Sequence, residues 1–295
     1  MVPDSQVDVI WPLACQLGEG VMWDAQAQRV LFVDIHGCRI HAWSPSTHAR
    51  HSWPVAERVG WILPTQTPAR YVVGLQSGFA TLHLDVPHEL TWLDRVFKDE
   101  PHMRLNDAKT DTQGCIWAGS LNNDDESKPE GRLFKLTPDG HVQVVDDGYA
   151  VCNGPAISPD GQLFLHTDSA RQTIYAFDAR DGALHHKRIW KTFSPEEGYP
   201  DGMTFDAQGQ VWVAHWGGAC VSQFDQSGAL LQRIPLPTSH ITNICFGGPR
   251  LDRMFVTSAK AGLTAQQLEA EPFAGALFEV HEHGATGLTI TPFAA

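Results

Sequence analysis

Short apolar segments recur along the chain at nearly constant spacing, and each has the pattern of a β-strand. They are AQRVLFVD, ARYVVGLQ, GCIWAGSL, GQLFLHTD, GQVWVAHW and LDRMFVTS, anchored at Leu31, Val72, Trp117, Phe164, Trp212 and Phe255. A second segment follows each of them, and these are RIHAWSP, FATLHLD, RLFKLTP, TIYAFDA, CVSQFDQ and ALFEVHE. Most of the second segments alternate apolar with polar residues, as half-buried strands do. The chain is therefore an internal repeat of strands with a period of about 40 to 50 residues.

Six such units predict an all-β fold, a six-bladed β-propeller with four-stranded blades, as one domain over residues 1–295. Helical solenoids of similar period are excluded, because the chain shows no sustained 3.6-residue periodicity and is rich in Gly, Pro and Asp. The ring must close, since open sheet edges promote aggregation. The segment QVDVIWPLA, which precedes the first repeat, is predicted to close it as a strand of the last blade.

Polar residues occupy an equivalent position in the first strand of most units. Four residues before Trp23, Thr110, Ile157, Phe205 and Phe246 stand Glu19, Asn106, Asn153, Asp201 and Thr242, and the second unit has about Trp61 there. The first strand of each blade lines the channel of a propeller, so these side chains are predicted to meet at one level. Their carboxylate and amide oxygens suit a hard divalent cation. The alternative for any single one is a turn residue, because Asn153-Gly154 and Asp201-Gly202 are ordinary turn dipeptides.

A second set of polar residues aligns near the end of the second strand of several units. It consists of Asp34, Ser120, Thr167 and His215, with Asp168 beside Thr167. These side chains either line the channel or have a hydrogen-bonded structural role. Trp216 follows His215 and is a candidate for a pocket wall, whereas His185 and His186 are expected in a solvent-exposed loop. The polar insertion at residues 121–132 is either a mobile surface loop or a lid over the pocket.

Composition and charge narrow the class of protein. The chain has 295 residues, of which 42% are hydrophobic and 19% charged, as in an ordinary globular protein. Asp and Glu number 34 against 21 Lys and Arg, which gives a net charge of -13 without any basic run, so neither nucleic acid nor an anionic membrane is expected as a partner. The six scattered cysteines form no C-x-x-C motif and are expected to be reduced and mostly buried. The N-terminus lacks the features of a signal peptide, and no apolar stretch approaches ~18 residues, which predicts a cytoplasmic protein.

Five motifs together resemble one known family over essentially the whole chain. They are LGEGVMWD, RLNDAKTDTQGCIWAGSL, CNGPAISPDGQLFLHTDS, YPDGMTFDAQGQVWVAHWGG and the late FGGP with MFVTSAKAGL. The chain resembles the SMP-30/gluconolactonase/regucalcin-like sugar lactonases, and HWGG and FGGP are most similar to bacterial aldonolactonases.

The resemblance implies one catalytic divalent metal ion in the channel of a six-bladed propeller. It places the metal ligands on Glu19, Asn153 and Asp201, substrate contacts on Arg104 and Asn106, and a further acidic contact near Asp124. The identity of the ion stays open among Ca²⁺, Mn²⁺, Mg²⁺, Zn²⁺ and Fe²⁺.

These residues lead to the hypothesis of metal-dependent hydrolysis of a sugar aldonolactone to the free aldonic acid. Asp201 is the expected general base, and Arg104, Asn106 and His215 make the pocket polar. An esterase or organophosphate hydrolase would use the same metal with a more apolar pocket, and a non-catalytic calcium-binding regulator would need no channel arginine. A protein-binding scaffold would expose apolar side chains at one end of the ring. A monomer or weak homodimer acting on a small-molecule sugar lactone is expected.

Overall fold

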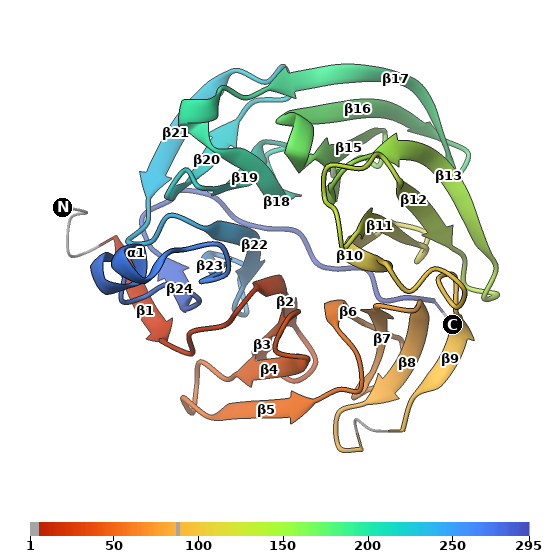
Figure 1. Cartoon of the computed structure of the whole chain (residues 1–295), viewed down its shortest axis with the longest axis horizontal. Helices are drawn as coiled ribbons and strands as arrows, with labels where there is room; N and C mark the ends of the chain where they lie inside the picture. The colour runs from red at the N-terminus through yellow and green to blue at the C-terminus, as the bar shows by residue number, and fades with distance from the viewer. Residues whose placement is uncertain (1–5, 87–88, 295) are drawn as a thin grey trace.

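The computed structural model describes residues 6–86 and 89–294, and these form six four-stranded antiparallel sheets arranged as blades in a ring (Figure 1). Blade one contains β2 (Gly18–Asp24), β3 (Arg29–Asp34), β4 (Arg39–Trp43) and β5 (Arg50–Pro54). Blade two contains β6 (Val59–Pro64), β7 (Arg70–Leu75), β8 (Phe79–His83) and β9 (Thr91–Asp94). Blade three contains β10 (Met103–Thr110), β11 (Ile116–Asn122), β12 (Gly131–Leu136) and β13 (Val142–Tyr149). Blade four contains β14 (Cys152–Ile157), β15 (Leu163–Asp168), β16 (Thr173–Arg180) and β17 (Ala183–Thr192). Blade five contains β18 (Tyr199–Phe205), β19 (Val211–Trp216), β20 (Cys220–Phe224) and β21 (Leu230–Pro235). Blade six contains β22 (Ile241–Gly247), β23 (Arg253–Ser258), β24 (Leu277–Val280) and β1 (Val7–Trp11). The prediction of a six-bladed propeller with four-stranded blades is confirmed.

The N-terminal strand closes the ring, as predicted. β1 pairs antiparallel with β24, with Val7 opposite Val280 and Val9 opposite Phe278. The last blade is therefore built from both ends of the chain, and its outermost strand is the first in sequence. This arrangement removes the open edge that an unclosed ring would leave.

The C-terminal segment crosses the ring at one end of the channel (Figure 1). The backbone N–H of Ala207 donates to the carbonyl of Thr286 at 2.8 Å, and the N–H of Phe293 donates to the carbonyl of Pro64 at 2.8 Å. The side chain of Phe293 is fully buried. The segment thus connects blade five to blade two and covers a cavity of about 210 Å³.

The core lies between neighbouring blades. Inner strands such as β2 are buried along their whole length, whereas outer strands such as β5 are mostly exposed. Met22 and Leu31 of blade one pack in one cluster with Ile62 and Val73 of blade two. Each blade therefore buries both of its faces against its neighbours, which explains why the inner strands are apolar except at the channel.

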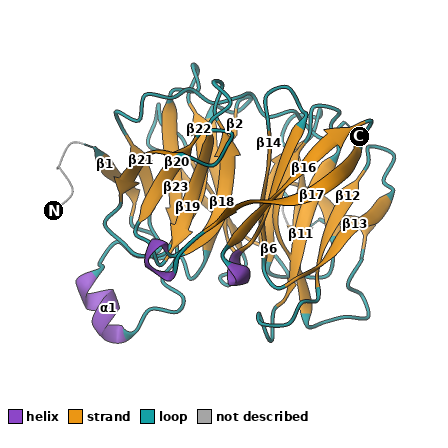
Figure 2. Cartoon of the chain, turned by 90° about the horizontal axis from the view of Figure 1, so that it is seen from above, coloured by secondary structure: helices purple, strands orange, loops and turns teal. Residues whose placement is uncertain are grey.

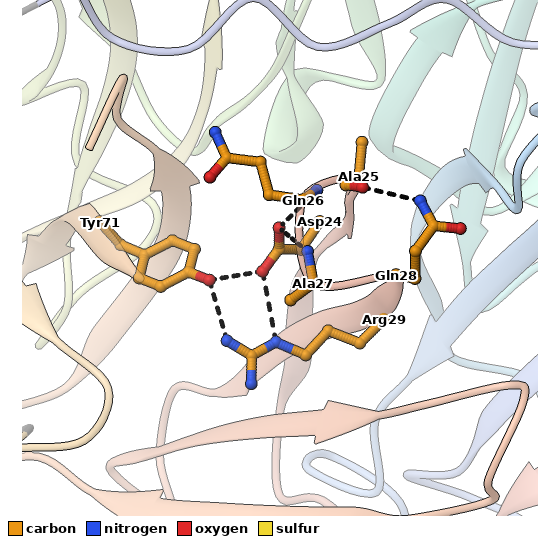
Figure 3. Close-up of polar contacts among 7 residues, drawn as sticks. All are labelled: Asp24, Ala25, Gln26, Ala27, Gln28, Arg29 and Tyr71. Carbon is orange, nitrogen blue, oxygen red and sulfur yellow. Dashed lines mark hydrogen bonds and ion pairs between the residues drawn. The ribbon is translucent and has the colours of Figure 1, made fainter. Parts of the chain in front are cut away.

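Asp24 closes the turn between β2 and β3 (Figure 3). Its Oδ1 accepts hydrogen bonds from the backbone N–H groups of Gln26 and Ala27, at 3.2 and 3.1 Å. Its Oδ2 accepts from the Tyr71 hydroxyl and from Nε of Arg29, the latter at 3.3 Å. Asp24 is therefore a structural carboxylate, committed to a turn and to the contact with blade two.

Asp111 and Asp206 occupy the same turn position in blades three and five. Each accepts two backbone N–H groups, and each also accepts the indole N–H of a tryptophan, Trp117 at 2.8 Å and Trp212 at 2.9 Å. The carboxylates at this end of the first strands, whether buried as Asp206 is or half-buried as Asp111 is, thus have their acceptor capacity used by the fold.

In the described part of the chain, three short helices lie at one end of the ring (Figure 2). They are η1 (Ser169–Arg171), η2 (Pro195–Glu197) and α1 (Ala265–Ala270), and α1 begins with a capping box between Thr264 and Gln267. Within residues 6–86 and 89–294, no helix has the length and apolar character needed to cross a membrane.

The prediction that His185 and His186 lie in a loop is wrong, although both are exposed as expected. They belong to β17, the outer strand of blade four. Nδ1 of His186 lies 2.8 Å from Oδ2 of Asp178 on the neighbouring strand. The pattern was misleading because an outer strand faces solvent on both sides and carries no apolar alternation.

Candidate active site

Each strand that lines the channel has a register shift at the level of the predicted ligands. The pairing of β2 with β3 shifts between Glu19 and Met22, and that of β14 with β15 shifts between Asn153 and Ala156. β6, β10, β18 and β22 have equivalent shifts. A bulge adds a residue to one strand and redirects its side chains. Here the shifts let polar side chains leave the sheet and enter the channel.

Five of the predicted site residues meet in one pocket. Glu19, Arg104, Asn106, Asn153 and Asp201 line a cavity of about 380 Å³ at one mouth of the channel, and each is at most 6% exposed. Residues of η1 also line this cavity, so its mouth lies at the end of the ring that carries the short helices (Figure 2). The convergence expected from the repeat is therefore present in the structure.

The two remaining equivalent positions supply no channel oxygen. In blade two, Trp61 is buried with its indole packed closely on Gly74. In blade six, the Thr242 hydroxyl donates to the carbonyl of Gly18 at 2.5 Å and lies 2.9 Å from the Thr257 hydroxyl. The pocket thus has its oxygens on blades one, three, four and five.

A hydrogen-bond network fixes the amides and the arginine. Nδ2 of Asn106 donates to Oδ1 of Asn153 at 2.8 Å, and Nδ2 of Asn153 donates to the Ser169 hydroxyl at 2.9 Å. The Arg104 guanidinium donates to Oδ1 of Asn106 and, at 3.0 Å, to Oδ1 of Asn123. Because each donor and acceptor has a defined partner, the amide orientations are set before any ligand arrives.

Two buried carboxylates of the pocket, Glu19 and Asp201, have pKa values above the ordinary range. Burial, followed by the nearby charge of Asp107, raises the pKa of Glu19 to about 7. Burial and the charges of Glu19 and Asp107 raise the pKa of Asp201 well above its ordinary value. Among the described residues, no hydrogen-bond donor reaches the buried Oδ1 of Asp201. A cation bound beside this pair would favour the ionised form of both carboxylates.

Asp107 and Asn243 form a second polar layer in the channel that the repeat did not reveal. Nδ2 of Asn243 donates to Oε2 of Glu19 at 2.9 Å and to Oδ2 of Asp107 at 3.1 Å. A Cβ atom on Gly202 would lie 2.3 Å from the Asn243 side chain, so the glycine makes room for it. The Asn243 amide of this layer thus orients the Glu19 carboxylate. The only sign of the layer in the sequence is the polar pair Asn106-Asp107 in an otherwise apolar strand.

Two predicted substrate contacts do not line the pocket. His215 is fully buried within blade five, and its Nδ1 lies 2.7 Å from the carbonyl oxygen of Glu197, which turns the ring away from the ligand group. Asp124 is exposed on the loop between β11 and β12. Glu126 of the same loop lines the pocket instead, and so does His36, which sequence reasoning missed. The loop between β11 and β12 thus approaches the mouth of the pocket, but with Glu126 rather than Asp124.

The second set of aligned polar residues has structural roles. Asp34 accepts backbone N–H groups of Gln16 and Leu17, both at 3.0 Å, in the segment that enters β2. Asp168 does the same for the segment before β14, with distances of 3.1 and 3.2 Å. Both carboxylates therefore hold the entry to a strand that carries a predicted ligand.

The donor set fits a hard divalent cation. Glu19, Asn153 and Asp201 provide oxygen atoms only, and Asp201 has a buried oxygen without a donor. In the described part of the chain, no cluster of three His, Cys, Asp or Glu side chains is placed to hold a metal by itself, so a site here depends on the amide oxygen. Oxygen ligands favour ions such as Ca²⁺, Mg²⁺ or Mn²⁺.

Comparison with known proteins places these features in a family. The model of the SMP-30/Gluconolactonase/LRE-like region matches residues 17–260. Regucalcin from Xenopus laevis is 32% identical over 288 residues, which is 95% of each chain, and the pentonolactonase XacC from Haloferax volcanii is 34% identical over 248 residues, 83% of this chain and 82% of that one. A luciferin-regenerating enzyme superposes with a TM-score of 0.91 at 28% identity, covering 98% of this chain and 99% of that one. The calcium-binding protein regucalcin from Agrobacterium tumefaciens has a TM-score of 0.93 at 22% identity, covering 100% and 99%, and supports the fold. The chain belongs to the SMP-30/gluconolactonase/LRE-like family.

Proposed function

We propose that the protein hydrolyses the ring ester of a sugar lactone, an aldonolactone, with a divalent cation bound in the channel. The observation that carries the proposal is the unpartnered oxygen of Asp201, in one pocket with Glu19, Asn153 and the Arg104–Asn106 pair. Membership of the family and the relative named as a pentonolactonase support the substrate class.

Each residue of the pocket has a role in this reaction. Glu19, Asn153 and Asp201 would hold the cation, which when bound acts as a Lewis acid on the lactone carbonyl. Asp201 takes a proton from the water that attacks the carbonyl carbon, because an ionised carboxylate within hydrogen-bond reach is a general base. Arg104, oriented by Asn106, donates to the oxygen that gains charge in the tetrahedral intermediate. The ring C–O bond then breaks, and Asp201 returns its proton to the leaving alkoxide, which gives the open-chain hydroxy acid.

A non-catalytic calcium-binding role is the second candidate, because the structural neighbour from Agrobacterium tumefaciens is described as a calcium-binding protein, regucalcin, and curated relatives bear the same name. The pocket argues against a pure ion carrier, since Arg104 is buried, hydrogen-bonded to Asn106 and lines the same cavity as the carboxylates. An esterase for wholly apolar substrates is disfavoured, because Arg104, Asn106 and Glu126 place charged and amide groups in the pocket beside its apolar lining.

A panel assay separates these functions. Acid release from γ- and δ-aldonolactones is measured by pH-stat, with and without a chelator, and after adding back Ca²⁺, Mg²⁺, Mn²⁺, Zn²⁺ or Fe²⁺ separately. We expect hydrolysis that a chelator stops and one or more of the cations restores. Cation binding without hydrolysis of any member of the panel would establish the non-catalytic role instead.

Replacement of Glu126 tests how the loop between β11 and β12 takes part. Glu126 lines the pocket, and its charge acts on Arg104. Glu126→Gln removes a charged hydrogen-bond acceptor for sugar hydroxyls. It is therefore expected to raise KM about tenfold with little change in kcat. Asp124→Asn in the same loop is the matched control and is expected to leave KM unchanged. Equal effects of the two substitutions on KM would exclude a specific contact by Glu126.

A further inference from the structure

Aromatic side chains from neighbouring strands line up along one side of the pocket mouth. Tyr199 at the start of β18 is the register partner of Trp216 at the end of β19, and Trp216 forms an antiparallel bridge with His240. Tyr199 and Trp216 line the pocket, and Tyr199 is 45% exposed. Tyr199 and Trp216, with His240 packed behind Trp216, are here called the aromatic wall, and His240 lies just before β22 of blade six.

The central member of the aromatic wall is held in place. The rings of Trp216 and His240 are stacked, with centroids 4.0 Å apart and an interplanar angle of 17°. Nδ1 of His240 lies 2.9 Å from the carbonyl oxygen of Ala261, which orients the imidazole. A Cβ atom on Gly262 would lie 3.4 Å from His240 and 3.6 Å from Trp216, so this glycine packs against both rings. The indole therefore has one face covered by His240.

The part of the pocket formed by blade three is polar. Arg104 and Asn106 belong to β10, and Glu126 follows β11 of the same blade. Tyr199 and Trp216 belong to β18 and β19 of blade five, and blade four lies between blades three and five in the ring (Figure 1). A ligand in this cavity thus meets hydrogen-bonding groups from blade three and aromatic carbon from blade five.

We propose that the C–H face of the sugar-lactone ring packs on the aromatic wall while its hydroxyl groups face Arg104, Asn106 and Glu126. The proposal rests on the proposed function and names Trp216 as a residue that determines substrate affinity. The negative face of an aromatic ring attracts polarised C–H groups, and the contact also removes apolar area from water. A flat, polyhydroxylated ring with one face of C–H bonds matches both the aromatic and the hydrogen-bonding lining of the pocket.

Trp216→Leu and Tyr199→Ala test the aromatic wall, with Trp216→Phe and Tyr199→Phe as matched aromatic controls. We expect Trp216→Leu to raise KM for an aldonolactone about tenfold and Tyr199→Ala about threefold, with kcat within about twofold of the wild type. The Phe variants keep an aromatic face, so the KM of each should lie between that of the wild type and that of the non-aromatic variant at the same position. Cation affinity, measured by calorimetry, should be the same in all five proteins, which shows that the pocket is intact. Tyr199 is not part of the buried core, so its substitution tests the wall even if Trp216→Leu fails to fold.

A second readout keeps this proposal separate from the proposed function. Binding of a hydrolysis-resistant sugar lactam is measured by calorimetry in the same variants. If the wild type hydrolyses no lactone yet binds the lactam, and Trp216→Leu loses about tenfold in affinity, the proposed function fails and the aromatic wall stands. If Trp216→Leu and Tyr199→Ala both bind the lactam as the wild type does, or if the wild type does not bind it, the aromatic wall is overturned.

Discussion

Asp201→Asn is expected to lower kcat/KM for the aldonolactone by about 10³-fold while the protein stays folded. Asparagine keeps the shape of the side chain but cannot accept the proton of the attacking water. The substitution also removes one of three buried carboxylates, Glu19, Asp107 and Asp201, that repel one another, so the metal-free variant should be no less stable than the wild type. Rates are measured by pH-stat at saturating cation, and unfolding is measured by calorimetry in chelator.

Asp206→Asn is the matched control for this experiment. Asp206 comes directly after β18, the strand that contains Asp201. It is also buried, and it accepts hydrogen bonds from backbone N–H groups and from the indole N–H of Trp212. Its substitution should cost about 1 to 3 kcal/mol of stability and leave kcat/KM near the wild-type value. Activity of Asp201→Asn within tenfold of the wild type would remove Asp201 from the role of general base.

The repeat was enough to predict the ring and the convergence of Glu19, Asn153 and Asp201. A strand has a fixed relation to the blade that contains it, so equivalent positions in six blades lie at one level around the axis. The period therefore placed residues that are far apart in sequence next to one another. No single motif does this, because each of these residues by itself fits a turn equally well.

The second polar layer escaped sequence analysis for a physical reason. In a regular strand, Asp107 would point away from the side that Asn106 faces, because side chains alternate. The register shift between Leu105 and Ala108 breaks this alternation, and both side chains reach the channel region. Asn243 lies at the equivalent irregularity of β22. Bulges leave no dependable mark in a single sequence, so their consequences need the structure.

Asp124 and His215 are expected in the pocket from the sequence, and neither lines it. The repeat does not determine the direction in which these side chains point. Asp124 and Glu126 lie in a loop, where the direction of a side chain depends on local turns such as the hydrogen bonds that Asn122 accepts from the backbone of Asp124 and Asp125. His215 lies in the predicted strand, but its ring direction is decided by the carbonyl of Glu197 in η2. That helical turn had no counterpart in the other blades.

Glu19→Gln should stabilise the metal-free protein relative to the wild type at neutral pH and not at acid pH. The folded state raises the pKa of Glu19 from 4.5 to about 7, so it binds the proton more tightly than the unfolded chain does. Between these two pH values the unfolded state releases this proton and the folded state retains it, so stability falls as pH rises. Glutamine mimics the protonated form and removes this loss, which is on the order of 2 to 3 kcal/mol above pH about 7.

The difference between variant and wild type is the quantity to measure, because buried histidines act in the opposite sense. Burial lowers the pKa of His41 and His215 to about 4, so their contribution to stability is lost as pH falls below the ordinary histidine value. Unfolding temperatures of both proteins in chelator, from pH 4.5 to 8, cancel this shared background. Added divalent cation should reverse the order above pH 7, because only the wild type keeps the full ligand set and gains binding energy in the folded state. A difference that is independent of pH in chelator, or an order that the cation leaves unchanged, would show that Glu19 is not the buried carboxylate that couples folding to the cation.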